Sequence, residues 1–236
     1  MLTAVLFDLD DTLFDHRHCT HAALQALRAR SAHLALWPEQ ELYARHSAIL
    51  EELHLDVLAG RLSVDEARVR RFLRLFADAG APQLPDEAAA SAAAYREAYL
   101  GAWRLVPGAL PLLKTLRSRV RIGVVTNNLV SEQQRKVRTL GLGSYVDALV
   151  ISEAVGVNKP EARIFEIALE RLGAAAADAA MVGDSWATDI EGARAAGIRA
   201  IWFNPQRRER PEPADVRELE SLEPAAHAAA IILGAA

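Results

Sequence analysis

The feature that most constrains this chain is a short apolar run, Ala4–Phe7, followed directly by two carboxylates and a hydroxyl, Asp8, Asp10 and Thr12. Side chains along a strand alternate between its faces, so Asp8 and Asp10 project to the same side. Two carboxylates this close raise the cost of ionising each other unless a cation lies between them. Mg²⁺ is typically held by few carboxylates and several waters, which leaves a carboxylate oxygen free to attack phosphorus. The pattern therefore predicts a site for phosphoryl transfer.

Length, composition and charge limit the classes to which the chain can belong. Its 236 residues are 51% hydrophobic, enough to bury a full core in one domain or in one domain with a large insertion. The net charge of −4 argues against a broad nucleic-acid surface, which needs a basic face. The single cysteine excludes an internal disulfide, and no signal-peptide pattern or membrane-length apolar run is present. We expect a cytoplasmic protein, monomer or homodimer, whose partner is a small molecule and not nucleic acid or membrane.

The chain has two textures. Apolar residues recur at helical spacing from about residue 15 to residue 104, whereas short β-branched runs alternate with amphipathic helices from residue 107 onward. Strands are predicted at residues 3–7, 120–126, 148–151, 180–182 and 200–203. The simplest architecture is a doubly wound α/β core with a parallel sheet, formed by residues 1–15 and 105–236 and interrupted by a helical cap at 16–104. Ligands of such cores bind at the carboxyl ends of the strands.

Further polar residues follow the later strands of the predicted core. Thr126 and Asn127 end one strand, and Lys159 precedes a helix. Asp184 ends another strand, with Asp189 five residues later. Thr126 is predicted to hold a phosphate oxygen, Lys159 to neutralise phosphate charge, and the two aspartates to add carboxylates on the metal side. The same residues have ordinary alternatives, since Thr126 can cap a helix and Asp189 can complement a helix dipole.

Four motifs occur in order along the chain, each at a predicted strand end: Asp8-x-Asp10-x-Thr12, Thr126, Lys159-Pro160, and Gly183-Asp184 with Asp189. This series resembles the motifs of the haloacid dehalogenase (HAD) superfamily. Any one motif would occur by chance, but four in this order are specific. The helical insertion resembles the C1 cap of subfamily IA. More loosely, residues 150–160 and 202–210 resemble the bacterial pyrimidine 5'-nucleotidases.

The resemblance implies roles for the residues of the first and last motifs. Asp8 is the nucleophile that forms an aspartyl-phosphate, and Asp10 protonates the leaving oxygen and then activates water. The Asp8 carboxylate, the Asp10 backbone carbonyl and the Asp184 carboxylate ligate Mg²⁺. Asp189 and Thr12 are implied to contact these groups without binding the metal themselves. Asp189 would orient a water or the lysine of the third motif.

The middle motifs are implied to hold the phosphate. Thr126, the backbone N–H of Asn127 and Lys159 bind the equatorial oxygens on which charge develops. Asp10 favours a phosphatase over the dehalogenase branch, because a halide leaving group needs no acid. The predicted activity is Mg²⁺-dependent hydrolysis of a small phosphomonoester, with nucleoside 5'-monophosphates favoured by the subgroup likeness. Phosphatases acting on sugar phosphates or phosphoglycolate, phosphomutases and non-catalytic interaction domains remain alternatives.

Most side chains singled out outside the motifs are predicted to have ordinary roles, although some of His16, His18, Cys19 and His21 are expected to line the cap entrance and meet the substrate. Trp186 is expected to pack, and the run Arg207, Arg208 and Arg210 is expected to be a solvated loop. The histidines around Cys19 crowd into one turn, which rarely permits the tetrahedron of a zinc site. The cap is expected to move on hinges near residues 15–17 and 105–108. If it does, replacing Gly108 with proline should lower turnover.

Overall fold

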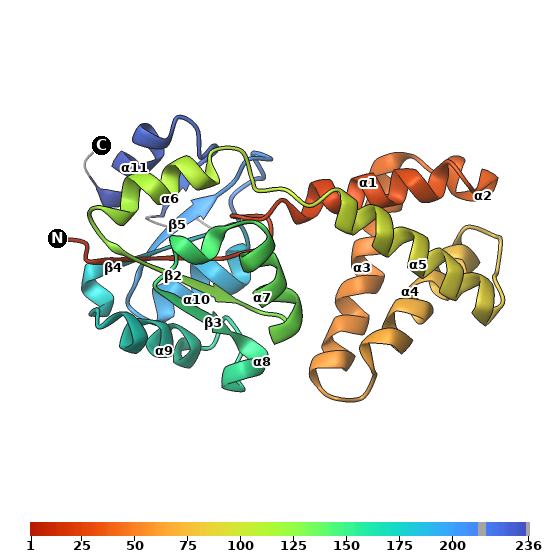
Figure 1. Ribbon diagram of the computed structural model, residues 1–236, viewed down its shortest axis with the longest axis horizontal. Helices are drawn as coiled ribbons and strands as arrows, with labels where there is room; N and C mark the ends of the chain where they lie inside the picture. Colours follow the sequence, from red (N-terminus) through yellow and green to blue (C-terminus); the bar gives the residue numbers. More distant parts are fainter. Residues whose placement is uncertain (212–215, 235–236) are drawn as a thin grey trace. The chain divides into compact units, whose positions relative to one another are not determined.

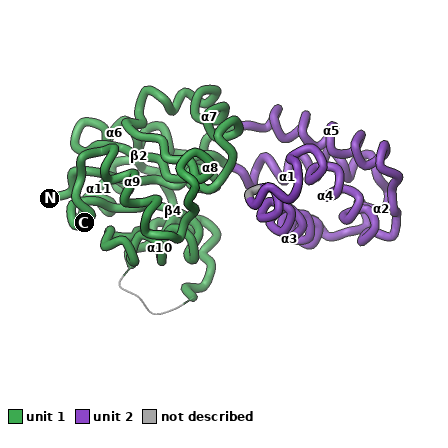
Figure 2. The backbone as a smooth tube through the Cα atoms, turned by 90° about the horizontal axis from the view of Figure 1, so that it is seen from below, with its two compact units in different colours: residues 1–15, 104–236 green, residues 16–103 purple. Residues whose placement is uncertain are grey.

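The structure is a computed structural model that describes residues 1–211 and 216–234. The chain divides into two compact units (Figure 2). The core unit comprises Met1–Asp15 with Arg104–Ala236, and the helical unit comprises His16–Trp103. Asp15 and Arg104, which flank the helical unit in the chain, form an ion pair at 2.7 Å. The chain therefore leaves and re-enters the core unit at one place.

The core unit contains a parallel sheet of six strands in the order β3-β2-β1-β4-β5-β6, which confirms the predicted doubly wound α/β class. Along the chain the strands are β1 Ala4–Phe7, β2 Arg121–Thr126, β3 Ala148–Ile151, β4 Ala179–Gly183, β5 Arg199–Phe203 and β6 Arg217–Leu219. All five predicted strands are present, but β6 was missed. Its sequence, Arg-Glu-Leu, is short and polar at the sheet edge, so it carries no apolar pattern.

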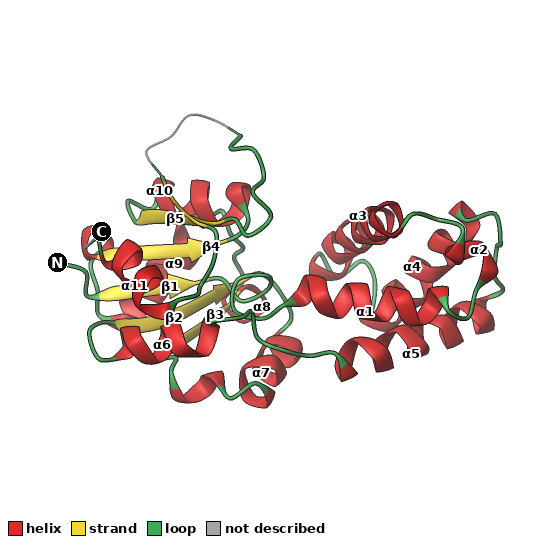
Figure 3. Ribbon diagram, turned by 90° about the horizontal axis from the view of Figure 1, so that it is seen from above, coloured by secondary structure: helices red, strands yellow, loops and turns green. Residues whose placement is uncertain are grey.

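Helices cover both faces of the sheet (Figures 1 and 3). They are α6 Ala109–Arg117, α7 Val130–Thr139, α8 Ser152–Val155, α9 Ala162–Leu172, α10 Glu191–Ala195 and α11 Ala225–Leu233, with 3₁₀ turns η1 Leu142–Ser144 and η2 Ala176–Asp178 and a π-helical turn η3 Trp186–Ile190. One face buries Leu6 and Met181 against apolar side chains of α9 and α10, and α6 and α11 lie on the other side. Because all strands are parallel, their carboxyl ends meet at one edge, which is where the polar motifs lie.

The helical unit has a hydrophobic core of its own. Its helices are α1 His16–Arg28, α2 Ala32–Ala35, α3 Glu39–Leu58, α4 Val64–Asp78 and α5 Pro85–Gly101. Ser63 and Glu66 form a capping box at the start of α4, and Pro85 begins α5. The helical spacing read in the sequence is confirmed at Leu42 and Phe72, which are fully buried. Among the described residues no helix has the length and apolarity needed to cross a bilayer.

Gly108, at one expected hinge, is constrained by packing. Its φ is +84°, in the left-handed region that favours glycine. A Cβ there would lie 2.7 Å from backbone atoms of Leu222. Proline at Gly108 would therefore disturb the contact with Leu222 whether or not the segment moves, so this substitution does not test a hinge.

Candidate active site

The turn after β1 presents the first motif at the sheet edge. The backbone of Asp11 has φ +61°, a left-handed conformation that aspartate tolerates better than most residues. The N–H of Phe14 donates to the Leu9 carbonyl at 2.8 Å and closes the turn. Asp8 and Asp10 are thereby fixed at the carboxyl end of the strand, where the sequence predicted them.

A buried lysine joins two of the predicted aspartates. Lys159 Nζ lies 2.5 Å from Asp8 Oδ1 and 2.6 Å from Asp189 Oδ1. Burial raises the pKa of the Asp8 carboxyl to about 7, against the opposing effect of the lysine. Burial alone would lower the pKa of Lys159, but Asp189 and Asp8 outweigh it and raise that pKa above its ordinary value. The lysine therefore supplies a fixed positive charge beside Asp8.

Asn127 holds the segment that carries this lysine. Its Oδ1 accepts a hydrogen bond from the backbone N–H of Lys159 at 2.7 Å, and its Nδ2 donates to the Lys159 carbonyl at 2.9 Å. The side-chain amide thus ties the end of β2 to the segment before α9. The sequence predicted Asn127 for its backbone N–H only, and the role of its side chain was missed.

The Asp10 carboxylate is held by α7. Lys136 Nζ lies 2.5 Å from its Oδ1, and Gln133 Nε2 donates to its Oδ2 at 2.8 Å. Gln133 Nε2 also lies 2.7 Å from Thr126 Oγ1, so one amide links the first and second motifs. Both α7 residues are buried, and sequence reasoning missed them. Their i, i+3 spacing puts them on one helix face, a signal that could have suggested them.

Three carboxylates form a group that fits a divalent cation. Oxygens of Asp8, Asp184 and Asp189 all lie within 4.8 Å of one another, and no other group of this kind occurs among the described residues. Burial, and then the charges of Asp8 and Asp189, hold the pKa of Asp184 well above its ordinary value. Lys159 alone does not balance three acids. Excess negative charge on hard oxygen ligands is the donor chemistry that suits Mg²⁺.

Asp189 is the most enclosed member of this group. It is fully buried in η3, and its Oδ2 accepts a hydrogen bond from the Ser185 N–H at 3.0 Å. A Cβ at position 183 would lie 2.3 Å from Asp189 Oδ2, so only glycine fits there. Both oxygens of Asp189 therefore have protein donors, Ser185 and Lys159, and this arrangement suits a residue that orients the lysine.

The arginine segment lies in a loop and Arg208 is exposed, as expected, but its side chain also contacts the acidic group. Its Nη2 donates to the Asp184 carbonyl at 2.6 Å and lies 3.4 Å from the Asp184 carboxylate. Buried Asn204 holds this segment, because its Oδ1 accepts from the Arg208 N–H at 2.9 Å. Arg208 therefore contacts the acidic group from a distant part of the sequence, which a charge run alone does not reveal.

Trp186 and Thr12, which were also singled out from the sequence, are both buried. Trp186 packs edge to face on Trp202, with ring centroids 5.2 Å apart, as expected for a packing residue. Thr12 is fully buried, and its Oγ1 has no hydrogen-bond partner among the described residues. Thr12 lies in the turn of the first motif but does not contact its carboxylates through a hydrogen bond.

The arrangement at the strand ends agrees with comparisons of the chain with known proteins. The sequence model of the family of haloacid dehalogenase-like hydrolases matches residues 2–197 of this chain. The chain belongs to this family. The membership predicted from the four motifs is thereby confirmed, and with it subfamily IA.

Relatives of this HAD hydrolase include enzymes named for different substrates. The chain is 37% identical over 208 residues to a ribulose-1,5-bisphosphate 5-phosphatase of Halopiger xanaduensis, covering 87% of this chain and 86% of the relative. It is 32% identical over 226 residues to the pyrimidine 5'-nucleotidase YjjG of Escherichia coli, covering 92% of this chain and 96% of the relative. The subgroup likeness therefore extends to more than one kind of substrate.

A solved structure of similar fold is that of the HAD hydrolase YfnB from Bacillus subtilis, bound to magnesium. It superposes with a TM-score of 0.74 at 26% identity and covers 97% of this chain and 98% of YfnB. YfnB also shows interdomain movement. The likeness spans both units of the present chain.

Proposed function

We propose that this HAD hydrolase is a Mg²⁺-dependent phosphatase that cleaves small phosphomonoesters through an aspartyl-phosphate. The observation that carries the proposal is the position of Asp8, which has a buried cation, Lys159, on one side and the carboxylate of Asp184 within 4.8 Å. A nucleophile between a fixed cation and a group of acids suits a site that receives a phosphate together with a metal. The relatives named as phosphatases and a nucleotidase support the same reaction class.

The chemistry is assigned to two residues of the β1 turn. An Asp8 oxygen attacks phosphorus, and the bond from phosphorus to the leaving oxygen breaks as Asp10 gives that oxygen a proton. Asp10 then removes a proton from a water, whose oxygen attacks the aspartyl-phosphate. The acyl-phosphate bond breaks, so inorganic phosphate leaves and the Asp8 carboxylate is restored. Lys136 and Gln133, which contact the Asp10 carboxylate, position this acid and base.

The remaining residues hold phosphate and metal. Thr126, the Asn127 backbone N–H and Lys159 are assigned to the phosphate oxygens. The Asp8 and Asp184 carboxylates, with the Asp10 backbone carbonyl, would hold Mg²⁺. When bound, the ion neutralises phosphate charge and the mutual repulsion of the acids. Asp189 acts through Lys159, with which it forms an ion pair at 2.6 Å.

Two substrate classes follow from the relatives. The likeness to a pyrimidine 5'-nucleotidase supports nucleoside 5'-monophosphates, and the likeness to a ribulose-bisphosphate phosphatase supports sugar phosphates. Both present the same monoester to the core unit. We further propose that the helical unit acts as the cap that selects between them, since it supplies none of the residues assigned to phosphate or metal.

A phosphate-release assay with Mg²⁺ across nucleoside monophosphates, sugar phosphates and phosphoglycolate tests these proposals. Replacement of the nucleophile in Asp8→Asn is expected to lower turnover by roughly a thousandfold or more. Asp65→Asn changes a side chain that is 92% exposed in the helical unit and serves as the matched control. Equal turnover by Asp8→Asn and the parent would contradict the covalent mechanism. Isomerisation without phosphate release would indicate a mutase, and no reaction at all would favour an interaction domain.

A further inference from the structure

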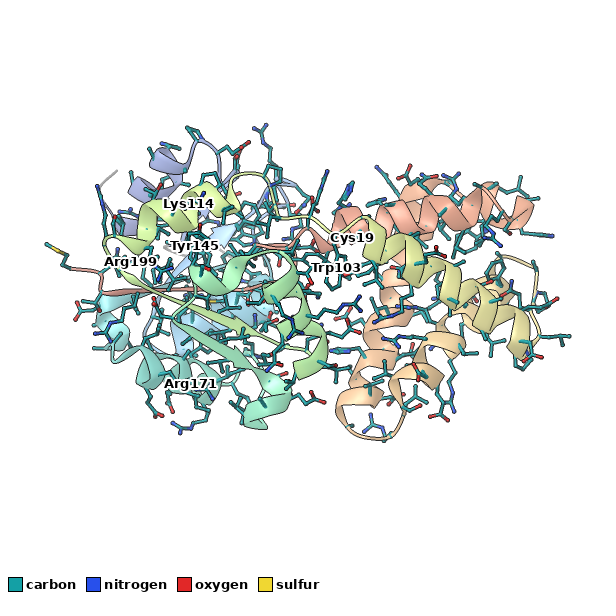
Figure 4. All side chains as sticks on the ribbon, viewed as in Figure 1. Cys19, Trp103, Lys114, Tyr145, Arg171 and Arg199 are labelled. Atoms are coloured by element: carbon teal, nitrogen blue, oxygen red, sulfur yellow. The ribbon has the colours of Figure 1, made fainter. Side chains whose placement is uncertain are left out.

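Gln133 is a buried glutamine of α7 that joins two parts of the candidate active site. It is fully buried in the core unit, whose side chains are drawn in Figure 4. Its Nε2 donates to Asp10 Oδ2 at 2.8 Å and lies 2.7 Å from Thr126 Oγ1. Gln133 thus connects the residue assigned to acid and base chemistry with one assigned to phosphate.

The two contacts of the Gln133 amide have a defined direction. Asp10 forms an ion pair with Lys136 at 2.5 Å, and a carboxylate accepts hydrogen bonds but donates none. The amide nitrogen of Gln133, and not its oxygen, therefore faces Asp10. An amide nitrogen is only a donor and carries two hydrogens, one for each of its contacts. Thr126 Oγ1 is therefore the acceptor in its bond with Gln133.

The hydroxyl of Thr126 keeps its own hydrogen for another acceptor. A hydroxyl has one hydrogen and two lone pairs, and the bond from Gln133 uses a lone pair. Thr126 is 1% exposed, so bulk water has little access to this group. The hydrogen is therefore available to a phosphate oxygen, which is the role assigned to Thr126.

Lys136 restricts the movement of this amide. Its Nζ contacts Asp10 Oδ1 and lies 4.7 Å from the ring centroid of Phe14. Both Asp10 oxygens thus have a donor from α7, Lys136 on one and Gln133 on the other. Rotation of the Gln133 amide away from Thr126 would also break its bond to Asp10.

The amide oxygen of Gln133 argues against a purely structural role. Gln133 Oε1 is buried and has no hydrogen-bond partner among the described residues. A buried acceptor without a partner costs free energy, and an apolar side chain of similar shape would avoid that cost. What the glutamine adds at this position is its pair of donors.

We infer that Gln133 is a positioning residue that directs the hydroxyl hydrogen of Thr126 toward the phosphate. The inference rests on the proposed function, in which Thr126 binds a phosphate oxygen. Gln133 acts through Thr126 and needs no contact with the substrate. One amide thereby holds both the phosphate-binding hydroxyl and the carboxylate of Asp10.

The experiment measures binding of inorganic phosphate by calorimetry in the presence of Mg²⁺, because binding of this ion requires no turnover. Gln133→Met keeps an unbranched side chain and removes both donors. It is expected to weaken phosphate binding by about 10-fold, since the Thr126 hydroxyl can then turn away. Gln133→Glu is expected to weaken it by about 100-fold, because a carboxylate would accept the Thr126 hydrogen. Gln134→Met, at the exposed neighbouring position of α7, is the matched control and should stay within about twofold.

Variants of Thr126 separate positioning from a general disturbance of the fold. Thr126→Val removes the hydroxyl, so adding Gln133→Met to it should weaken phosphate binding by no more than about twofold. Thr126→Ser keeps a hydroxyl, so adding Gln133→Met should again cost about 10-fold. An equal loss in all three backgrounds is the result expected of a merely structural residue and would overturn the inference. Melting temperatures show whether each variant folds, and Gln133→Leu replaces Gln133→Met should the latter not fold.

Turnover of 4-nitrophenyl phosphate separates failure of this inference from failure of the proposed function. In Gln133→Met, kcat/KM for this substrate is expected to fall by about 10-fold, as phosphate binding does. A parent that binds inorganic phosphate but releases none from 4-nitrophenyl phosphate would contradict the proposed function, and the phosphate titrations would still decide the role of Gln133. Phosphate binding that is absent from the parent, or unchanged in both Gln133→Met and Gln133→Glu, would overturn the inference.

Discussion

Lys159 in the core unit and Arg71 in the helical unit are both buried cations, but their surroundings differ. Lys159 is 5% exposed and lies 2.5 Å from Asp8 and 2.6 Å from Asp189. Arg71 is 9% exposed, and its guanidinium lies against the rings of Phe72 and Tyr95. One cation has more negative charge around it than it can balance, and the other has none among the described residues.

The two units differ in how they compensate a buried charge. Burial of an ion is costly unless opposite charge and hydrogen bonds compensate it. The core unit compensates Lys159 with Asp8 and Asp189, and the repulsion within the group of three acids suits a divalent cation. The helical unit compensates Arg71 only with the weaker cation–π contacts to Phe72 and Tyr95.

Removing the paired lysine should cost the most stability. Lys159→Met leaves Asp8 and Asp189 facing each other without a cation, and we expect a loss of about 3–5 kcal/mol in the free energy of unfolding. Urea denaturation at pH 8 measures the loss. Lys114→Met, at an exposed position of α6, is the matched control and should change little. A loss no greater than that of the control would show that the ion pairs contribute nothing to stability.

His46 should make stability fall in acid. Its pKa in the folded protein lies well below 6.5, whereas the unfolded chain binds a proton near that value. Stability from the neutral form is therefore fully present above pH 6.5 and is lost as the pH falls. The slope is up to about 1.4 kcal/mol per pH unit.

Urea titrations of the parent and of His46→Phe between pH 8 and pH 5 measure the contribution of His46 as the difference between the two slopes, because the raised pKa values of Asp8 and Asp184 contribute a slope of opposite sign to both proteins. His46→Phe should remove the contribution of His46, because Phe has no proton to bind, whereas His33→Phe, at an exposed position, should retain it. A parent and a His46→Phe variant with the same pH profile would show that His46 titrates normally in the folded protein.

Removing Arg71 should have the smallest effect, and it should stabilise the protein instead of destabilising it. Arg71→Met keeps an unbranched apolar side chain and removes the cost of burying a charge, at the loss of two cation–π contacts. We expect a gain of about 1 kcal/mol in the free energy of unfolding. Denaturation without added anions measures it. A loss as large as that of Lys159→Met would break the comparison, because Arg71 would then stabilise the unit as strongly as a paired ion.

Much of the core unit could be predicted because its signals are local. Each apolar run forms a strand, and parallel connections bring the polar residues after those runs to one edge. Asp8 and Lys159 are 151 positions apart in the chain, yet both were expected at this edge. The polar strand β6 was missed because three residues without an apolar pattern carry no such signal.

The contacts between side chains could not be predicted in the same way. Lys136 binds the Asp10 carboxylate although the two residues are 126 positions apart, and the Asn127 side-chain amide hydrogen-bonds to the backbone of Lys159. Arg208 is exposed in its loop, as a charge run predicts, but Asn204 holds its segment so that the guanidinium also contacts Asp184. These pairings depend on side-chain direction, which neighbouring residues do not specify.

The order of the amino acids was enough to predict the α/β class, the helical insertion, the family and the edge of the sheet where the motifs meet. Periodicity and motif order are properties of neighbouring residues, so they can be read without a structure. Only the tertiary structure decided which acids share a lysine and which arginine of the α4 run, Arg68, Arg70, Arg71 or Arg74, is buried. Burial and charge balance arise when distant side chains exclude water together, and that depends on the packing of the whole unit.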